Sequence, residues 1–173
     1  MQRRNFLQMS ALGALPASLG LMQNAWAQAK DTIMFGCPVP MSGAFAANGK
    51  FADLGTKLAI EQYGKALGRP LAYTLLDTEG KPATAVRKVQ EAAQQQGARF
   101  FAGGILSGEA LAMGKEAEKA GGLFVTTAGA DEITGKDCNP ATFRWSVPTF
   151  GAIEQTVRPL LEALPKAKRV YTI

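Results

Sequence analysis

The chain has 173 residues, of which 47% are hydrophobic and 19% are charged, a composition typical of a folded globular protein and not of a disordered or fibrous one. The formal net charge of +5 comes from scattered basic residues without the basic and aromatic stripes of a nucleic-acid-binding surface. The sequence has no histidine, which excludes histidine-dependent catalysis and removes the commonest metal ligand. We therefore expect no catalytic residue, no metal site, no cofactor and no nucleic-acid partner.

Residues 1–29 have the pattern of an export signal. A basic start is followed by a weakly apolar stretch, and Ala27 and Ala29 each end a small-residue motif of the A-x-A type, so cleavage at either position is expected. The run Arg3-Arg4-Asn5-Phe6-Leu7-Gln8 resembles a twin-arginine signal, although Gln8 stands where lysine is usual. The alternative is an ordinary secretory signal that begins with two arginines. Both alternatives predict export and removal of this segment.

After residue 30, short β-rich runs alternate with helical patterns, which predicts βαβ units and an α/β fold with a doubly wound parallel sheet. The predicted strands are residues 32–39, 71–76, 100–104, 123–127 and 142–147. The predicted helices are a first one that ends near Gly64, a second from Pro82 to Gln96, a third from about Gly108 to Ala120, and a fourth around residues 153–164. The run 169–173 predicts the start of another strand, so we expect the sequence to stop within an element.

Apolar residues at helical spacing mark one face of each predicted helix. These residues are Phe51, Leu54 and Leu58 in the first helix, Ala85, Val89 and Ala92 in the second, Ala110, Met113, Ala117 and Ala120 in the third, and Ile153, Val157, Leu161 and Leu164 in the fourth.

The two cysteines, Cys37 and Cys138, form neither a C-x-x-C motif nor a zinc ligand pair. In an oxidising compartment they could form a disulfide, but nothing in the sequence brings their Cα atoms within the roughly 7 Å that a disulfide needs. Two buried or half-buried free thiols are the alternative, and both alternatives stay open.

Three predicted loops follow strands and are rich in small residues, which leaves backbone N–H groups accessible to a small ligand. They are residues 40–49, 103–109 and 126–131. Ser107 lies where the third helix is expected to begin, and a helix start offers free N–H donors to an anion such as a carboxylate. An ordinary N-cap is the alternative role for Ser107, and the two roles are compatible.

Nucleotide binding and hydrolysis are poorly supported by the same loops. Five residues rather than four separate Gly43 from Gly49-Lys50, and Phe51 replaces the Ser or Thr that a P-loop uses for magnesium. The order Gly104-Ile105-Leu106-Ser107-Gly108 is not a G-x-S-x-G nucleophile elbow.

The sequence from residue 31 to 173 resembles the periplasmic leucine/isoleucine/valine-binding proteins, the type I solute-binding subunits of ABC importers. The motifs that carry this resemblance are Pro40-Met41-Ser42-Gly43 with Gly49, Asp77 with Pro82 and Ala85, Gly103 to Gly108, Thr126-Thr127-Ala128, and Cys138-Asn139-Pro140 with Thr142-Phe143-Arg144. It implies two α/β lobes that close on a ligand, with residues 30–150 as the ligand-binding first lobe and residues 151–173 as the crossover helix and first strand of a second, incomplete lobe.

The resemblance also implies which residues bind. A ligand carboxylate would be held by Ser107, Ala128 and Ala130, with Gly108 and Gly129 in the same loops. Ser42 and Asn48 belong to the first loop, and Asn48 stands where relatives often carry an aromatic residue, which puts a branched aliphatic ligand in doubt. The expected function is binding of an amino acid or amide in the periplasm for delivery to a membrane permease. A ligand-sensing regulator of the same fold is the first alternative, and a secreted α/β enzyme is the second.

Overall fold

A computed structural model describes residues 32–166, 168 and 169. Its centre is a six-stranded sheet with the order β2-β3-β1-β4-β5-β6. All neighbouring strands are parallel except β2 and β3, which are antiparallel. The strands are β1 (Ile33–Val39), β2 (Lys65–Ala66), β3 (Arg69–Asp77), β4 (Phe100–Gly103), β5 (Leu123–Thr126) and β6 (Thr142–Arg144). The prediction of an α/β fold with a mainly parallel sheet is confirmed.

The predicted strands are all present, with ends that differ by up to three residues. The sequence pattern missed β2, which pairs with β3 through a tight turn at Leu67 and Gly68. Leu67 and Gly68 have φ angles of 53° and 77°. A strand of two residues is too short to show an alternating pattern, which explains why it was missed.

The four predicted helices are also present: α2 (Ala46–Tyr63), α3 (Pro82–Gln95), α4 (Ser107–Lys119) and α5 (Thr149–Ala163). Short 3₁₀ turns, η1 (Gly43–Phe45) and η2 (Asp131–Ile133), precede α2 and follow β5. Pro82 occupies the first turn of α3, where its missing N–H costs nothing. Gly64 ends α2 with a φ of 55°, a conformation that glycine adopts readily.

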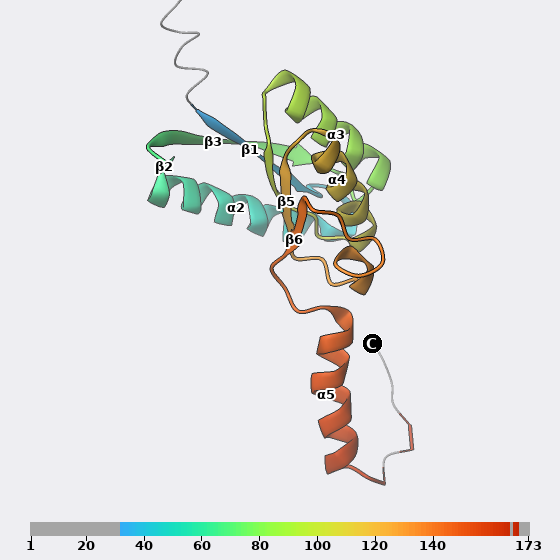
Figure 1. The fold of residues 1–173 in the computed structure, drawn as a ribbon. Coiled ribbons are helices and arrows are strands. Elements are labelled where there is room, and N and C mark those ends of the chain that lie inside the picture. The colour runs from blue at the N-terminus through green and yellow to red at the C-terminus, as the bar shows by residue number, and fades with distance from the viewer. Residues whose placement is uncertain (1–31, 167, 170–173) are drawn as a thin grey trace, which may run out of the picture.

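The core lies between the sheet and the helix pair α3 and α4, which cover the same face (Figure 1). Phe101 of β4 and Phe124 of β5 are almost fully buried in this layer. The helix residues predicted from spacing are buried with them, namely Ala85, Val89, Ala92, Ala110, Met113 and Ala117, while Ala120 is partly buried at the edge. The small size of these side chains lets the two helices pack closely over the strands.

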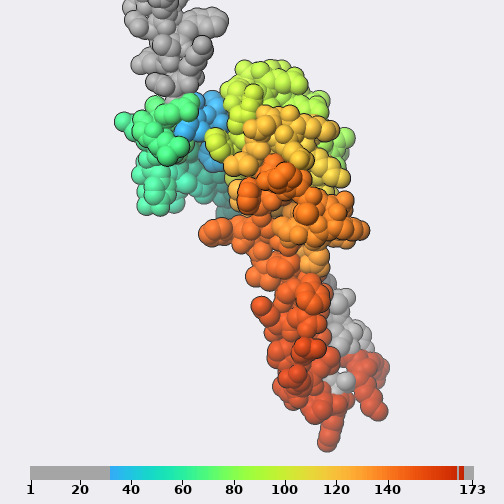
Figure 2. Space-filling view, viewed as in Figure 1, coloured from blue at the N-terminus to red at the C-terminus, as the bar shows by residue number. Residues whose placement is uncertain are grey.

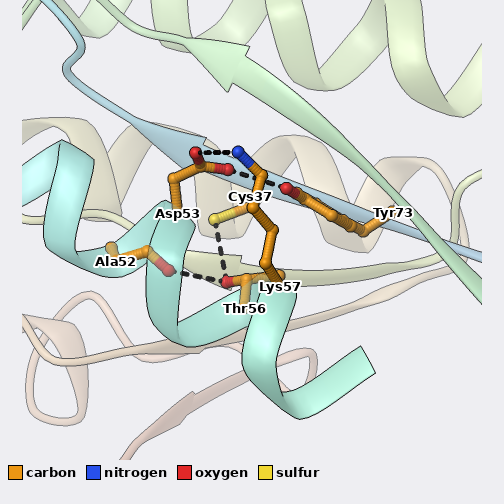
Figure 3. Close-up of polar contacts among 6 residues, drawn as sticks. All are labelled: Cys37, Ala52, Asp53, Thr56, Lys57 and Tyr73. Carbon is orange, nitrogen blue, oxygen red and sulfur yellow. Dashed lines mark hydrogen bonds and ion pairs between the residues drawn. The ribbon is translucent and has the colours of Figure 1, made fainter. Parts of the chain in front are cut away.

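Helix α2 packs on the opposite face, against β1 and β3. A polar cluster holds it there (Figure 3). The hydroxyl of Tyr73 donates to Asp53 Oδ1 at 2.7 Å, and Lys57 Nζ donates to Asp53 Oδ2 at 2.7 Å. Cys37 of β1 lies 3.5 Å from the hydroxyl of Thr56, which also donates to the carbonyl of Ala52 at 2.9 Å. Buried Asp53 is therefore fully paired, and it joins α2 to the sheet.

The apolar residues that marked α2 in the sequence do not face the sheet. Phe51, Leu54 and Leu58 are 74%, 59% and 63% exposed. The helix contacts the body through another side, where Gly49 and Asp53 are buried. A Cβ at Gly49 would lie 1.8 Å from the carbonyl oxygen of Pro40, so only glycine allows this approach. The spacing of these residues predicted a helix correctly. It did not predict which side of that helix packs against the other described residues.

Two further apolar surfaces are open in the described part of the chain. One lies on strands β4, β5 and β6, which α2 does not cover. There Phe100, Leu123, Val125 and Phe143 are each at least 40% exposed. The other is α5, which projects from the sheet and stands clear of the body in the space-filling view (Figure 2). Most of the fourth set of spaced residues lies on α5, and its last member, Leu164, directly follows the helix. In this set Ile153, Leu161 and Leu164 are exposed.

Both cysteines are free thiols. Cys37 is buried, and this burial raises the pKa of its thiol. Cys138 is exposed, which differs from the expectation of a buried or half-buried position.

The predicted export signal and the predicted last strand, apart from residue 169, lie outside the described residues. Within the described ranges, no helix is long and apolar enough to cross a membrane.

Candidate functional site

The carboxyl ends of β1, β3, β4 and β5 meet at one edge of the sheet because these strands are parallel. Asp77, the last residue of β3, connects two of the loops at this edge. Its Oδ1 accepts hydrogen bonds from the backbone N–H groups of Met41 and Glu79, both at 2.9 Å. The loop that contains Ser42 is thereby fixed to the loop that follows β3. This edge is where ligands bind in open α/β sheets.

Ser107 is the first residue of α4, one position earlier than the helix start expected from the sequence. The N-cap is Leu106, and no side chain in the described part of the chain caps the helix. The ordinary N-cap role considered for Ser107 is therefore wrong. The N–H groups of the first turn of α4 carry a partial positive charge and have no capping side chain, which leaves them available to an anion.

Ser107 and Ala130 are brought together by the fold. The backbone N–H of Ala130 donates to Ser107 Oγ at 3.3 Å, although the two residues lie in different loops. A serine hydroxyl has one donor hydrogen and two acceptor lone pairs. Since Ala130 occupies only one lone pair, the hydroxyl hydrogen of Ser107 is still free to donate to a ligand oxygen.

The side chain of Thr126 fixes the start of the loop after β5. Its buried hydroxyl donates to the carbonyl of Gly104 at 3.0 Å and accepts from the N–H of Ala128 at 3.1 Å. The N–H of Ala128 is thus engaged within the protein, whereas the N–H of Ala130 points to Ser107. Of the two backbone donors that the resemblance implied, Ala130 lies beside the serine hydroxyl in this structure.

The segment that leads into α5 also forms hydrogen bonds with this loop. Arg144 Nη1 donates to the carbonyl of Ala130 at 2.7 Å, and its Nη2 contacts the hydroxyl of Thr134. Thr149 donates to the carbonyl of Gly129 through its backbone N–H at 2.8 Å and through its hydroxyl at 2.9 Å. The sequence placed Thr126 in a candidate loop but did not indicate its two hydrogen bonds. Thr149 was not singled out, because it contacts Gly129 from a different element, 20 positions along the chain.

The other residues implied by the resemblance lie at the same edge but are more open. Gly108 follows Ser107 in α4 and is exposed, and Gly129 is half-buried. Ser42 lies just before η1, and Asn48 lies in the first turn of α2, with both side chains exposed. No hydrogen bond among the described residues connects Ser42 or Asn48 to Ser107 and Ala130.

A polar hollow of about 500 Å³ lies at the opposite edge of the sheet, between the ends of α3 and α4. Most of its polar side chains form hydrogen bonds with one another or with the backbone. Glu116 accepts from Gln90 at 2.8 Å and from Lys119 at 2.6 Å, and Arg99 donates to the carbonyl of Ala93 at 2.7 Å. We therefore place the candidate site at Ser107 and Ala130 rather than in this hollow. No group of three or more Cys, Asp or Glu side chains in the described ranges could hold a metal ion.

Comparisons with known proteins bear on the family and the fold of the chain. Residues 32–173 match the family model described as periplasmic binding protein. A sequence comparison with curated proteins finds no match.

Three solved structures illustrate the similarity. The amino acid ABC transporter substrate-binding protein from Pseudomonas fluorescens Pf-5 is 61% identical over 80% of this chain, with a TM-score of 0.75. A solute binding protein from R. palustris in complex with benzoate is 30% identical over 76% of this chain and 37% of its own, with a TM-score of 0.69. The branched-chain amino acid transporter substrate binding protein from Streptococcus pneumoniae in complex with isoleucine is 22% identical over 73% of this chain and 39% of its own, with a TM-score of 0.62, and shares the fold. The chain spans 37% of the length of the Pseudomonas protein.

Proposed function

Because the chain belongs to the periplasmic binding protein family, we propose that the protein is the extracytoplasmic solute-binding subunit of an ABC importer. The family match and the 61% identity to an amino acid ABC transporter substrate-binding protein support this role. In this proposal the protein performs no reaction. It binds a small solute between two lobes and delivers it to permease subunits in the membrane.

The observation that carries the proposal is the pairing of Ser107 with Ala130 at the carboxyl edge of the sheet. The N–H of Ala130 donates to Ser107 Oγ at 3.3 Å, which leaves the hydroxyl hydrogen of Ser107 to donate to a ligand oxygen. The uncapped start of α4 adds a partial positive charge at the same place. This set of donors suits a carboxylate, which accepts several hydrogen bonds on two oxygens.

A ligand with a carboxylate also agrees with the similar proteins. One is in complex with benzoate and another with isoleucine, and both of these molecules carry a carboxylate. We propose an amino acid or amide-type ligand with a carboxylate head group. Ser107, Gly108, Ala128, Gly129 and Ala130 would surround that group, and Ser42 and Asn48 would lie toward the rest of the ligand.

The proposed place of action is the periplasm. Residues 1–29 would direct export, by the twin-arginine route that Arg3 and Arg4 suggest, with cleavage near Ala27 or Ala29. Residues 30–150 would form the first lobe, and residues 151–173 would begin the second. The projection of α5 away from the sheet supports this division (Figure 1).

A thermal-shift screen of the full-length protein tests the proposal. The screen would contain the common amino acids, their amides, benzoate and hydroxylated benzoates. A true ligand raises the melting temperature with concentration, by a stabilisation of about 2.7 kcal/mol at one hundred times its Kd. Calorimetric titration should then give one site per chain.

The proposal fails if no carboxylate in the screen binds. It also fails if the full-length protein turns over a substrate, because that outcome would favour the secreted α/β enzyme. A ligand that binds tightly but is not imported by cells, while it alters the activity of another protein, would favour the sensing role instead.

A further inference from the structure

The peptide group between Gly129 and Ala130 has both of its polar atoms held by other elements. Its N–H donates to Ser107 Oγ, in α4, at 3.3 Å. Its carbonyl accepts from Thr149, the first residue of α5, through the backbone N–H at 2.8 Å and the hydroxyl at 2.9 Å. Peptide groups are planar and stiff, so a tilt that changes the hydrogen bond of the N–H also changes the hydrogen bonds of the carbonyl. One rigid group therefore connects the candidate site to α5.

A second contact binds the start of α5 to the same loop. The backbone N–H of Phe150, the next residue of α5, donates to both carboxylate oxygens of Asp131 at 3.1 Å. The N-cap residue, Pro148, provides no side-chain hydrogen bond. Asp131 thus satisfies a free N–H in the first turn, and its negative charge suits the positive end of the helix.

Among residues 32–166, 168 and 169, few other contacts orient α5 on the body of the molecule. The helix stands clear of the sheet in Figure 2, and its side chains Phe150 and Ile153 are 65% and 52% exposed. Ser146, in the segment before the helix, donates its hydroxyl to the carbonyl of Thr127 at 2.7 Å. The start of α5 is therefore attached chiefly to the loop formed by residues 127–131.

We infer that Thr149 and Asp131 are positioning residues for the ligand site. They hold the loop so that the N–H of Ala130 faces Ser107, and they transmit a change at Ser107 to the orientation of α5. The statement that ligand binding causes the change at Ser107 rests on the proposed function. The coupling between Ser107 and Thr149 does not rest on it. Because energetic coupling between two sites is reciprocal, a change at Thr149 must alter the bond at Ser107 as much as the reverse.

Amide hydrogen exchange, followed by NMR in the full-length protein without ligand, tests the coupling. Thr149→Val removes the hydroxyl donor and keeps the shape of the side chain. It should raise the exchange rate of the Ala130 N–H about fivefold, the effect of one net hydrogen bond. Ser107→Ala should raise the exchange rate of the Thr149 N–H by a similar factor. Thr149→Ser retains the hydroxyl and should restore the original rate at Ala130.

Ser146→Ala is the matched control, because it removes a hydroxyl from the same segment without touching the Gly129–Ala130 peptide. It should leave the exchange of the Ala130 N–H unchanged. Asp131→Asn is a second, milder variant that removes the charge and should speed exchange of the Phe150 N–H. The inference is overturned if Thr149→Val leaves Ala130 unchanged, if Ser146→Ala has an equal effect, or if Asp131→Asn leaves Phe150 unchanged.

These measurements use no ligand and so separate the two proposals. A failed ligand screen would overturn the proposed function and leave the coupling intact. Unchanged exchange rates would overturn the coupling, whatever the screen finds.

Discussion

The backbone N–H of Ala130 donates a hydrogen bond to Ser107 Oγ at 3.3 Å across 23 positions of the sequence. This contact joins the start of α4 to the loop that follows β5. It is made possible by β4 and β5 lying side by side and parallel, so that both loops emerge at the same edge. The binding site proposed for a carboxylate depends on this pair.

Ser107→Ala should weaken binding of the ligand found in the screen by about 10- to 100-fold. The reason is that a hydrogen bond to a charged group contributes about 1.5–3 kcal/mol. Calorimetric titration of the full-length protein measures the change. Ser107→Thr keeps a hydroxyl and should lose much less affinity. Unchanged affinity in Ser107→Ala would remove this serine from the site.

Gly49→Ala should destabilise the protein by about 1–3 kcal/mol, the usual cost of overpacking. The added Cβ would lie 1.8 Å from the carbonyl oxygen of Pro40, so the start of α2 must move away from the loop after β1. Gly55 lies in the same helix with nothing within 4 Å of an added Cβ. Gly55→Ala should therefore stabilise the protein by about 0.5–1 kcal/mol. Urea unfolding measures both, and equal effects of the two substitutions would contradict the close approach at Gly49.

Tyr73→Phe should lower the melting temperature most at neutral pH. The hydrogen bond from Lys57, and then that from Tyr73, holds the pKa of Asp53 below its ordinary 3.8, so this stabilisation is present above that pH and is lost as the pH falls further. Burial, and then the bond to Asp53, raises the pKa of Tyr73 from 10.0 to about 12, so its stabilisation is complete below pH 10 and is lost as the pH rises toward 12.

The difference in melting temperature between the original protein and Tyr73→Phe should therefore narrow at both ends of the pH range. Tyr63, 68% exposed at the end of α2, provides the control. Tyr63→Phe should have little effect at any pH. A difference for Tyr73→Phe that stays constant from acid to alkaline pH would show that its hydroxyl does not interact with an ionised Asp53.

Glu109→Met should stabilise the protein by about 1–3 kcal/mol. Glu109 is fully buried in the first turn of α4, and neither of its carboxylate oxygens has a hydrogen-bond partner among the residues that the structure describes. Such buried, unsatisfied groups cost about 1–3 kcal/mol, which exceeds the roughly 0.3–1 kcal/mol that an acid gains from the helix start. Chemical unfolding measures the change.

Glu118→Met is the control for Glu109→Met, because Glu118 lies on the exposed side of the same helix. It should change the stability by less than about 0.5 kcal/mol. A loss of stability in Glu109→Met alone would show that the carboxylate of Glu109 has a stabilising partner in the folded protein.

Much of the fold follows from the sequence because its signals are local. The spacing of Ala110, Met113 and Ala117 predicts a helix and its buried face, and both are found. The glycine-rich runs after the strands predict loops at one edge, since parallel strands must end together. These patterns depend only on backbone geometry over a few residues, so they can be recognised without knowing the tertiary structure.

Other features were decided only by tertiary structure. Phe51 and Leu58 are spaced like core residues, yet the side of α2 that packs on the sheet is set by distant partners, namely the carbonyl of Pro40 and the hydroxyl of Tyr73. Likewise, Thr149 acts on Gly129 from another element. The physical reason is that a local pattern fixes how a segment folds, whereas the contacts of a side chain depend on which distant segments the twist and order of the sheet bring beside it.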